Sequence, residues 1–338
     1  MRLKGIQVSR RDVLARAAAA ASAVSLACFA ANETSHDASV DIFDSHVHVW
    51  DLKQFHLPWL EQSMPVMRRD YSMADYVNAI AGLGVVSAAY IEVSVEAGQR
   101  EREAEYLVEL CRKNDNPIAV GVLGGDPREP GFREYIERFQ DRPCIRGVRF
   151  LYPRGGSVDH DFIRGLQLLG ERQLSFELQL GPPLVADAVR TVESCPQTHF
   201  VLNHCGGIEP RVFRADVEND SEARERRETW RRGIAAIAKR DNVVCKISGI
   251  ADASLPGEAT AQDLAPIVNF CLEQFGPDRV LFGGNWPVCL KASTLEHWVS
   301  ALKQIIANRP AQERRKLFYE NGVRVYRVDR PRKAAGAN

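Results

Sequence analysis

Strand-like and helix-like runs alternate along most of the chain. Eight short apolar runs predict strands, and the segments between them show the 3.6-residue periodicity of amphipathic helices. The expected strands are residues 40–50, 85–93, 117–123, 145–151, 174–180, 199–204, 242–247 and 279–282. Eight strands alternating with helices over about 250 residues are typical of a (β/α)8 barrel. We therefore expect an α/β fold of the TIM-barrel type, with one domain and one core.

Histidines stand at the ends of two of these expected strands, where the active sites of such barrels lie. The first strand ends in His46-Val47-His48. Because side chains alternate along a strand, Asp44, His46 and His48 are expected to project together. Two imidazoles spaced in this way can bind one metal ion, and His204 at the end of the sixth strand supplies a third ligand. The alternative is an accidental His pair on an exposed strand end.

Other strand ends supply further candidates. They are Glu92, Arg149, Glu177, Lys246 and the run Gly283-Gly284-Asn285-Trp286. His199 begins the sixth strand, so it is expected at the opposite end of the barrel as a structural residue. The fourth strand contains no lysine that could be carbamylated to bridge two metals. Any metal site should therefore hold a single ion.

Charge and cysteine content narrow the functional classes. Lys and Arg together number 44, as do Asp and Glu, so nothing indicates a nucleic-acid or polybasic membrane surface. Beyond residue 31, no apolar run is long enough to span a bilayer. Seven cysteines follow the N-terminal region without paired metal spacing, most of them beside apolar residues. They are expected to be small buried side chains rather than a disulfide framework.

The first 31 residues predict an export signal. Arg10-Arg11 precede an Ala-rich apolar run, and small residues near Ala30 fit a cleavage site, as in twin-arginine signals. A lipoprotein signal at Cys28 is the weaker alternative, because Ser25 stands where Leu is expected. Residues 32–39 are then a linker, 40–328 the barrel and 329–338 a flexible tail. The twin-arginine machinery is expected to deliver the mature protein to the periplasm or another extracytoplasmic compartment.

Five motifs resemble, in order, those of one family. They are Phe43-Asp44-Ser45-His46-Val47-His48-Val49-Trp50, Val201-Leu202-Asn203-His204-Cys205-Gly206-Gly207, Lys246-Ile247-Ser248-Gly249, Phe275-Gly276-Pro277-Asp278-Arg279 and Phe282-Gly283-Gly284-Asn285-Trp286-Pro287-Val288. The set is similar to the amidohydrolase-related (amidohydrolase family 2) TIM-barrel hydrolases, in the branch of sugar lactonases and 2-pyrone-4,6-dicarboxylate lactonase. The resemblance covers about residues 41–326. It implies a metallo-dependent type of hydrolase that opens a lactone or related cyclic ester of a sugar acid or small organic acid.

The resemblance also implies the contents of the site. It places His46, His48 and His204 around one divalent metal, expected to be zinc, or in a metal-independent oxyanion site. It implies that Arg149 and Lys246 bind an anionic or polyol substrate.

Tryptophans beside the strand ends could complete the site. Trp286, with Trp50 and Trp59, is expected to form a wall that faces a sugar. Simple packing is the alternative for these three side chains. The oligomeric state is not predicted.

One position departs from the family pattern. The pattern ends the eighth strand in Asp, the expected general base, whereas this chain has Asn285. An amide cannot take a proton near neutral pH. The base is then Asp44, Glu92 or Glu177, or a metal alone activates water. Two other functions stay open: a non-oxidative decarboxylase of the same superfamily, or a catalytically impaired barrel that binds a carbohydrate or a metal.

Overall fold

The computed structural model describes residues 40–153, 158–252 and 260–329. The chain divides into two compact units, residues 1–40 and 41–338, and the second contains every element described below. The predicted export signal and linker, and the predicted tail from residue 330 on, lie outside the described residues. In the part of the chain that is described, no helix has both the length and the apolar composition needed to cross a bilayer.

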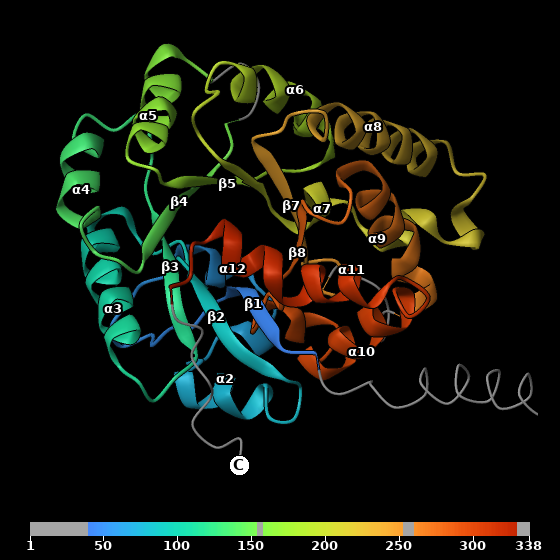
Figure 1. Cartoon of the computed structure of the whole chain (residues 1–338), viewed down its shortest axis with the longest axis horizontal. Helices are drawn as coiled ribbons and strands as arrows, with labels where there is room; N and C mark the ends of the chain where they lie inside the picture. Colours follow the sequence, from blue (N-terminus) through green and yellow to red (C-terminus); the bar gives the residue numbers. More distant parts are fainter. Residues whose placement is uncertain (1–39, 154–157, 253–259, 330–338) are drawn as a thin grey trace, which may run out of the picture. The chain divides into compact units, whose positions relative to one another are not determined.

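Eight parallel strands follow one another around a nearly closed barrel, in the order of the sequence (Figure 1). They are β1 (Ile42–Val47), β2 (Val85–Ile91), β3 (Ile118–Gly124), β4 (Ile145–Leu151), β5 (Ser175–Gln179), β6 (Phe200–Leu202), β7 (Val243–Ile247) and β8 (Val280–Phe282). A parallel bridge between Val47 and Trp286 brings the two ends of the sheet together. The predicted (β/α)8 architecture is thus confirmed.

Helices connect the strands and lie outside the ring that the strands form (Figure 1). The longer ones are α2 (Met73–Ala79), α3 (Arg100–Arg112), α4 (Phe132–Phe139), α5 (His160–Glu171), α6 (Pro182–Glu193), α8 (Ser221–Ile237), α9 (Ala261–Phe275) and α10 (Leu295–Ile305). The described residues also form the short helices α7 (His204–Gly207), α11 (Ala311–Arg315) and α12 (Asn321–Val325). Local sequence defines several helix starts, because Ser72 and Thr260 form reciprocal capping boxes with Asp75 and Asp263.

A cluster of buried apolar side chains forms part of the barrel core. Phe43, Val122 and Leu281 form part of a buried cluster there. Tyr326, which follows α12, belongs to the same cluster, and its hydroxyl donates a hydrogen bond of 2.5 Å to Glu177 Oε1 on β5. The C-terminal helix therefore contributes directly to the floor of the barrel. Within the described residues the cysteines form no disulfide bond, and all but Cys144 are buried, as predicted.

Candidate active site

The structure brings His46, His48 and His204 to one end of the barrel. His46 lies on β1, and His48 and His204 directly follow β1 and β6. The Nε2 atoms of His46 and His48 are 3.1 Å apart. The ring centroids of His46 and His204 are separated by 4.6 Å. Side chains that are 156 to 158 residues apart in the sequence thus share one site, since parallel strands end at the same edge of the barrel.

The backbone around His204 is shaped to place its ring. His204 and Cys205 have positive φ values of 54° and 53°, a region that costs free energy for residues other than glycine. Gly249, just after β7, has a φ of 61°, and a Cβ added there would lie 2.3 Å from His204 Nδ1. Position 249 can therefore carry no side chain while His204 occupies this place.

Hydrogen bonds set the orientation of two imidazoles. His48 Nδ1 lies 2.8 Å from the backbone oxygen of Ile91, which can only accept, so Nδ1 carries the proton. His48 Nε2 is then an acceptor, and it lies 3.1 Å from His46 Nε2. His204 Nδ1 lies 2.9 Å from Ser248 Oγ, which leaves its Nε2 available. Such bonds orient the rings of metal-binding histidines, but they equally suit imidazoles that hydrogen-bond a substrate.

Only part of the predicted ligand set fits a metal ion in this structure. Nitrogens 3.1 Å apart suit two ligands at about 2.0–2.2 Å from one ion. The donor atoms of all three histidines, however, do not come within 4.8 Å of one another, whereas those of the buried Cys205, Cys245 and Cys271 do. None of these thiols lines the cavity described below. His46 and His48 are therefore the two histidines that could bind one ion together, and His204 lies next to them.

Two buried ion pairs lie next to the histidines. Arg149 Nε donates to Glu92 Oε1 at 2.5 Å, and Arg149 Nη2 donates to the Glu92 backbone oxygen at 2.5 Å. Lys246 Nζ donates to Glu177 Oε2 at 2.7 Å, and Tyr326 holds the other oxygen of that carboxylate. Glu92 and Glu177, predicted as candidate bases, are therefore each already paired with a cation. Buried ion pairs of this kind hold their members in place more than they stabilise the fold.

Both cations also approach His46. Arg149 Nη1 lies 3.4 Å from His46 Nε2, and Lys246 Nζ lies 3.4 Å from His46 Nδ1. Burial, followed by the charges of these neighbours, lowers the pKa of His46 well below its ordinary value. Burial, Arg149 and Lys246 likewise lower the pKa of His204 to about 3. The imidazoles are neutral at physiological pH, and the positive charge beside them in the cavity wall is that of Arg149.

A cavity of about 350 Å³ opens above these groups. It is lined by His48, Trp59, Glu92, Val93, Ser94, Arg149, Leu151, Gln179, His204, Asp252, Asn285, Val288 and Lys291. Of the predicted site residues, His48, Glu92, Arg149, His204 and Asn285 are therefore in the wall. The cavity is large enough for a small-molecule substrate.

Four of the predicted site residues, His46, Lys246, Glu177 and Trp286, do not line this cavity, and His46 is fully buried. Lys246 and Glu177 are fully buried beneath it, so their role is to support His46 and not to contact a substrate. Trp286 is 2% exposed and packs against Tyr71 and Tyr76, with ring centroids 5.4 and 5.3 Å away. The expectation of a substrate contact from Lys246 or Trp286 is corrected accordingly; Trp59 is the tryptophan that faces the cavity.

Asp44 is positioned differently from the sequence expectation. Its carboxylate accepts hydrogen bonds from the backbone N–H groups of Gly284 and His46 and from the hydroxyl of Tyr76 on α2. The pairing of β1 with β2 shifts register between Asp44 and Val47, so strict alternation fails and Asp44 does not project with His46. Burial raises the pKa of Asp44 to about 6, but its hydrogen-bond partners give it a structural role.

Asp252 was missed by the sequence reasoning. It follows β7 by five residues, on the segment after the strand, and it lines the cavity beside Asn285. Asn285 Nδ2 lies 3.3 Å from Asp252 Oδ1 and donates to it. Burial raises the pKa of this carboxyl group. Asp252 lies in the segment after the strand and not at the strand end, so the pattern of strand ends does not indicate it. The signal available in the sequence was an acidic residue in the loop that follows a strand.

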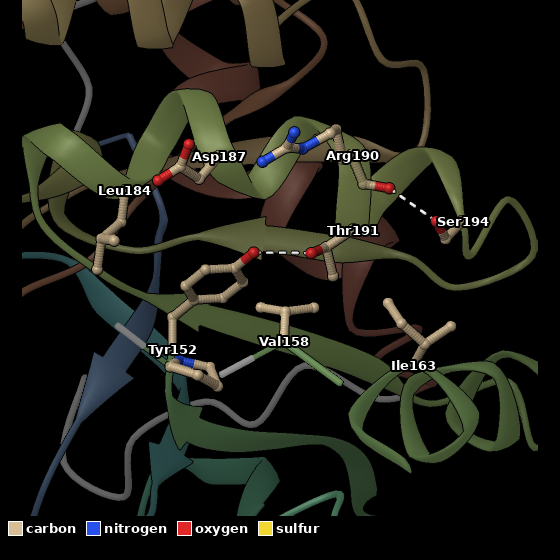
Figure 2. A pocket seen from close by; sticks show the side chains of 9 residues that line it. Tyr152, Val158, Ile163, Leu184, Asp187, Arg190, Thr191 and Ser194 are labelled. Atoms are coloured by element: carbon tan, nitrogen blue, oxygen red, sulfur yellow. Dashed lines mark hydrogen bonds between the residues drawn. The ribbon is translucent and has the colours of Figure 1, made fainter. Parts of the chain in front are cut away.

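A second hollow lies apart from the histidines, between α5, α6 and the residues that follow β4 (Figure 2). Its volume is about 320 Å³, and Tyr152 and Thr191 join across it by a hydrogen bond of 2.7 Å between their hydroxyl groups. Asp187 and Arg190 also line it. None of its lining residues is a histidine or a member of the two buried ion pairs. The first cavity is therefore the candidate active site.

Acidification is expected to destabilise the fold through His204. An unfolded chain protonates this side chain near pH 6.5, whereas the folded protein, with a pKa of about 3, keeps it neutral. Between these values the unfolded state binds more protons, so the free energy of unfolding falls as pH drops from about 6.5 toward 3. Asp44, with its raised pKa of about 6, acts in the opposite direction.

Urea unfolding of the wild type and His204→Asn across this pH range isolates the contribution of His204, because both proteins retain Asp44. The difference in the free energy of unfolding should change by a few kcal/mol, with the steeper loss in the wild type. Parallel pH dependences of the two proteins would contradict the prediction.

Comparisons with known proteins identify the family of this chain. The profile of the family described as Amidohydrolase matches residues 43–328. The chain is 28% identical over 298 residues to an L-fucono-1,5-lactonase of Burkholderia multivorans, an alignment that covers 85% of this chain and 96% of that relative. It is 22% identical over 344 residues to an L-rhamnono-gamma-lactonase of Scheffersomyces stipitis, covering 85% and 98% of the two chains.

Solved structures are similar over the same region. A crystal structure of an amidohydrolase from Burkholderia multivorans with bound zinc has a TM-score of 0.73 and 25% identity, covering 85% of this chain and 99% of that chain. A probable 2-pyrone-4,6-dicarboxylic acid hydrolase from Acinetobacter baumannii with citric acid bound has a TM-score of 0.65 and 14% identity, with coverage of 85% and 99%. The second likeness is one of fold.

Proposed function

We propose that this chain, which belongs to the amidohydrolase family and is a hydrolase, opens the lactone ring of a sugar acid or small organic acid. The observation that carries the proposal is the buried guanidinium of Arg149, fixed in the cavity wall beside neutral imidazoles. Attack on a lactone carbonyl creates negative charge on its oxygen, and a fixed cation stabilises that charge. The names of two relatives, both lactonases of sugar acids, support this substrate class.

The chain's own residues supply binding and charge stabilisation. Glu92 holds Arg149 through its carboxylate and through its backbone oxygen, so the guanidinium needs no reorganisation during the reaction. His48 and His204 lie in the same wall as neutral hydrogen-bonding groups. Lys291 adds a second positive charge to the wall, suited to the carboxylate that ring opening creates. Trp59 offers an aromatic face to a sugar ring.

A divalent metal, when bound, would polarise the carbonyl or lower the pKa of water. His46 and His48 would hold it. These two imidazoles are the convergent donors, however, and the cations of Arg149 and Lys246 each lie 3.4 Å from a nitrogen of His46. Structural and catalytic zinc sites usually have at least three protein ligands. The charge stabilisation described above is therefore assigned to Arg149.

Removal of metal is expected to leave lactone hydrolysis within about twofold of the untreated enzyme, because Arg149 supplies the charge that a metal otherwise supplies. Metal content and turnover should be measured before and after treatment with a chelator, with buffer-treated enzyme as the control. A loss of turnover that added zinc restores would contradict this expectation and favour a metal held by the histidines.

The proposed function is tested with a panel of five- and six-membered lactones of sugar acids, read as acid release in weakly buffered solution. Faster acid release than the spontaneous rate from at least one lactone is the expected result. Release of carbon dioxide from aromatic hydroxy acids, without lactone turnover, would instead identify a decarboxylase. Saturable binding of sugars without any turnover would identify a catalytically impaired binding barrel.

We also propose that the protein is exported by the twin-arginine route and works in the periplasm or another extracytoplasmic compartment. The support is the sequence of the first 31 residues, with Arg10-Arg11 before an apolar run. N-terminal sequencing of the protein from its native cells should give a start between Ala30 and Ser39. An intact chain that begins at Met1 in the cytoplasm would refute export.

A further inference from the structure

The proposed hydrolysis needs a group that removes a proton from water, and the expected position cannot supply it. Asn285 stands at the end of the eighth strand, and an amide does not accept a proton near neutral pH. The three carboxylates predicted in its place are all held by other partners. Asp44 accepts three hydrogen bonds, Glu92 pairs with Arg149 and Glu177 pairs with Lys246.

Asp252 differs from these carboxylates in its place and in its contacts. It lines the cavity, and its side chain interacts with an amide group; among the residues that the structure describes, no Lys or Arg forms an ion pair with it. Asn285 donates one N–H to Asp252 Oδ1 over 3.3 Å, which orients the carboxylate but leaves acceptor positions on both oxygens. Burial raises the pKa of Asp252, while the hydrogen bond from Asn285 and the charge of Lys291, in the same wall, act in the opposite direction.

We infer that Asp252 is the general base of the hydrolysis, and that Asn285 has become the residue that positions it. The inference rests on the proposed lactone hydrolase function. The two side chains are in contact, and both line the same cavity.

An Asp252 oxygen takes a proton from a water molecule, and the electron pair of that O–H bond forms the new bond to the lactone carbonyl carbon. The carbonyl π electrons move to the oxygen, where Arg149 stabilises the charge. When the tetrahedral intermediate collapses, the bond from that carbon to the ring oxygen breaks. Asp252 returns the proton to the ring oxygen, which leaves as the hydroxyl group of the open hydroxy acid.

Asp252→Asn is the first test, because it removes the charge with little change of shape. We expect kcat on a lactone hydrolysed by the wild type to fall about 10²–10⁴-fold, with KM changed by no more than a few fold. The acid limb of the pH profile of kcat, which reports protonation of the base, should disappear. Glu134→Gln, an exposed carboxylate on the outer helix α4, is the matched control and should behave like the wild type.

The exchange variant Asp252→Asn/Asn285→Asp separates loss of a base from loss of structure. It keeps one carboxylate and one amide in contact but returns the acid to the strand end. We expect at least tenfold more activity than for Asp252→Asn alone, together with a restored acid limb.

The outcomes distinguish the inference from the function on which it rests. If the wild type opens no lactone, the proposed function fails, and the role of Asp252 fails with it. If the wild type is active and Asp252→Asn retains kcat within about threefold, or retains the same acid limb, the function stands and the base is not Asp252.

Discussion

Replacing Lys246 with Met is expected to lower the free energy of unfolding by about 3–5 kcal/mol. Lys246 and Glu177 are both fully buried and lie 2.7 Å apart. Removal of the ammonium leaves the Glu177 carboxylate buried, with the Tyr326 hydroxyl as its remaining hydrogen-bond partner among those described. An uncompensated buried charge is the main cost of such a substitution. Urea unfolding, monitored by circular dichroism, measures the change if the transition is two-state.

The double variant Lys246→Met/Glu177→Gln provides the decisive comparison. It removes both charges but retains an acceptor for Tyr326, so it should be clearly more stable than Lys246→Met. Arg164→Met, in an ion pair on α5 whose side chains are both more than half exposed, is the control and should change stability by less than about 1 kcal/mol. Equal destabilisation by the single and double variants would mean that packing, and not the buried charge, determines the loss.

Replacing Arg149 with Met is expected to lower kcat/KM for lactone hydrolysis by about 10²–10³-fold, the usual effect of removing one donor aimed at a developing oxyanion. Arg149 faces the cavity, and both of its bonds to Glu92 measure 2.5 Å, so its position is fixed before substrate binds. Initial rates of acid release on the best lactone measure the effect. Arg149→Lys should recover only part of the lost kcat/KM, because an ammonium group lacks the planar set of N–H donors that binds Glu92 at two points.

Loss of Arg149 also leaves Glu92 buried without its cation, so the variant needs a stability control. Arg149→Met/Glu92→Gln removes both charges and should recover stability without recovering turnover. Arg138→Met, from the exposed pair with Glu101, should retain wild-type kinetics. Recovery of turnover in the double variant would show that Arg149 acts by compensating Glu92 and not by stabilising the transition state.

Local sequence patterns predicted the frame of this molecule well. All eight strands lie within two or three residues of their expected bounds, because each apolar run is short and is bounded by turn residues. The spacing of His46 and His48 also placed both imidazoles at the same end of the barrel. Such features depend on neighbouring residues and on the fixed geometry of parallel strands, which a sequence carries directly.

Pairing between distant side chains could not be predicted in the same way. Arg149 and Glu92 are 57 residues apart, and Lys246 and Glu177 are 69 apart, so their partnership depends on the final side-chain directions. The register shift in β1 changed the direction of Asp44. These three-dimensional details decide which carboxylates are occupied by other partners. The sequence therefore indicated several acidic candidates but not Asp252. Among the described residues, the carboxylate of Asp252 faces the cavity and forms no ion pair with a cation.

The contact between Tyr326 and Glu177 has a consequence for the order in which the molecule is completed. Tyr326 lies 149 residues after Glu177 and only a few residues before the end of the barrel domain. Its ring packs against Phe43 at the start of β1, with centroids 6.0 Å apart. The polar layer beneath the histidines is thus complete only when the segment that carries Tyr326 has folded back onto β1 and β5. Formation of the site therefore depends on contacts between the first and last elements of the barrel.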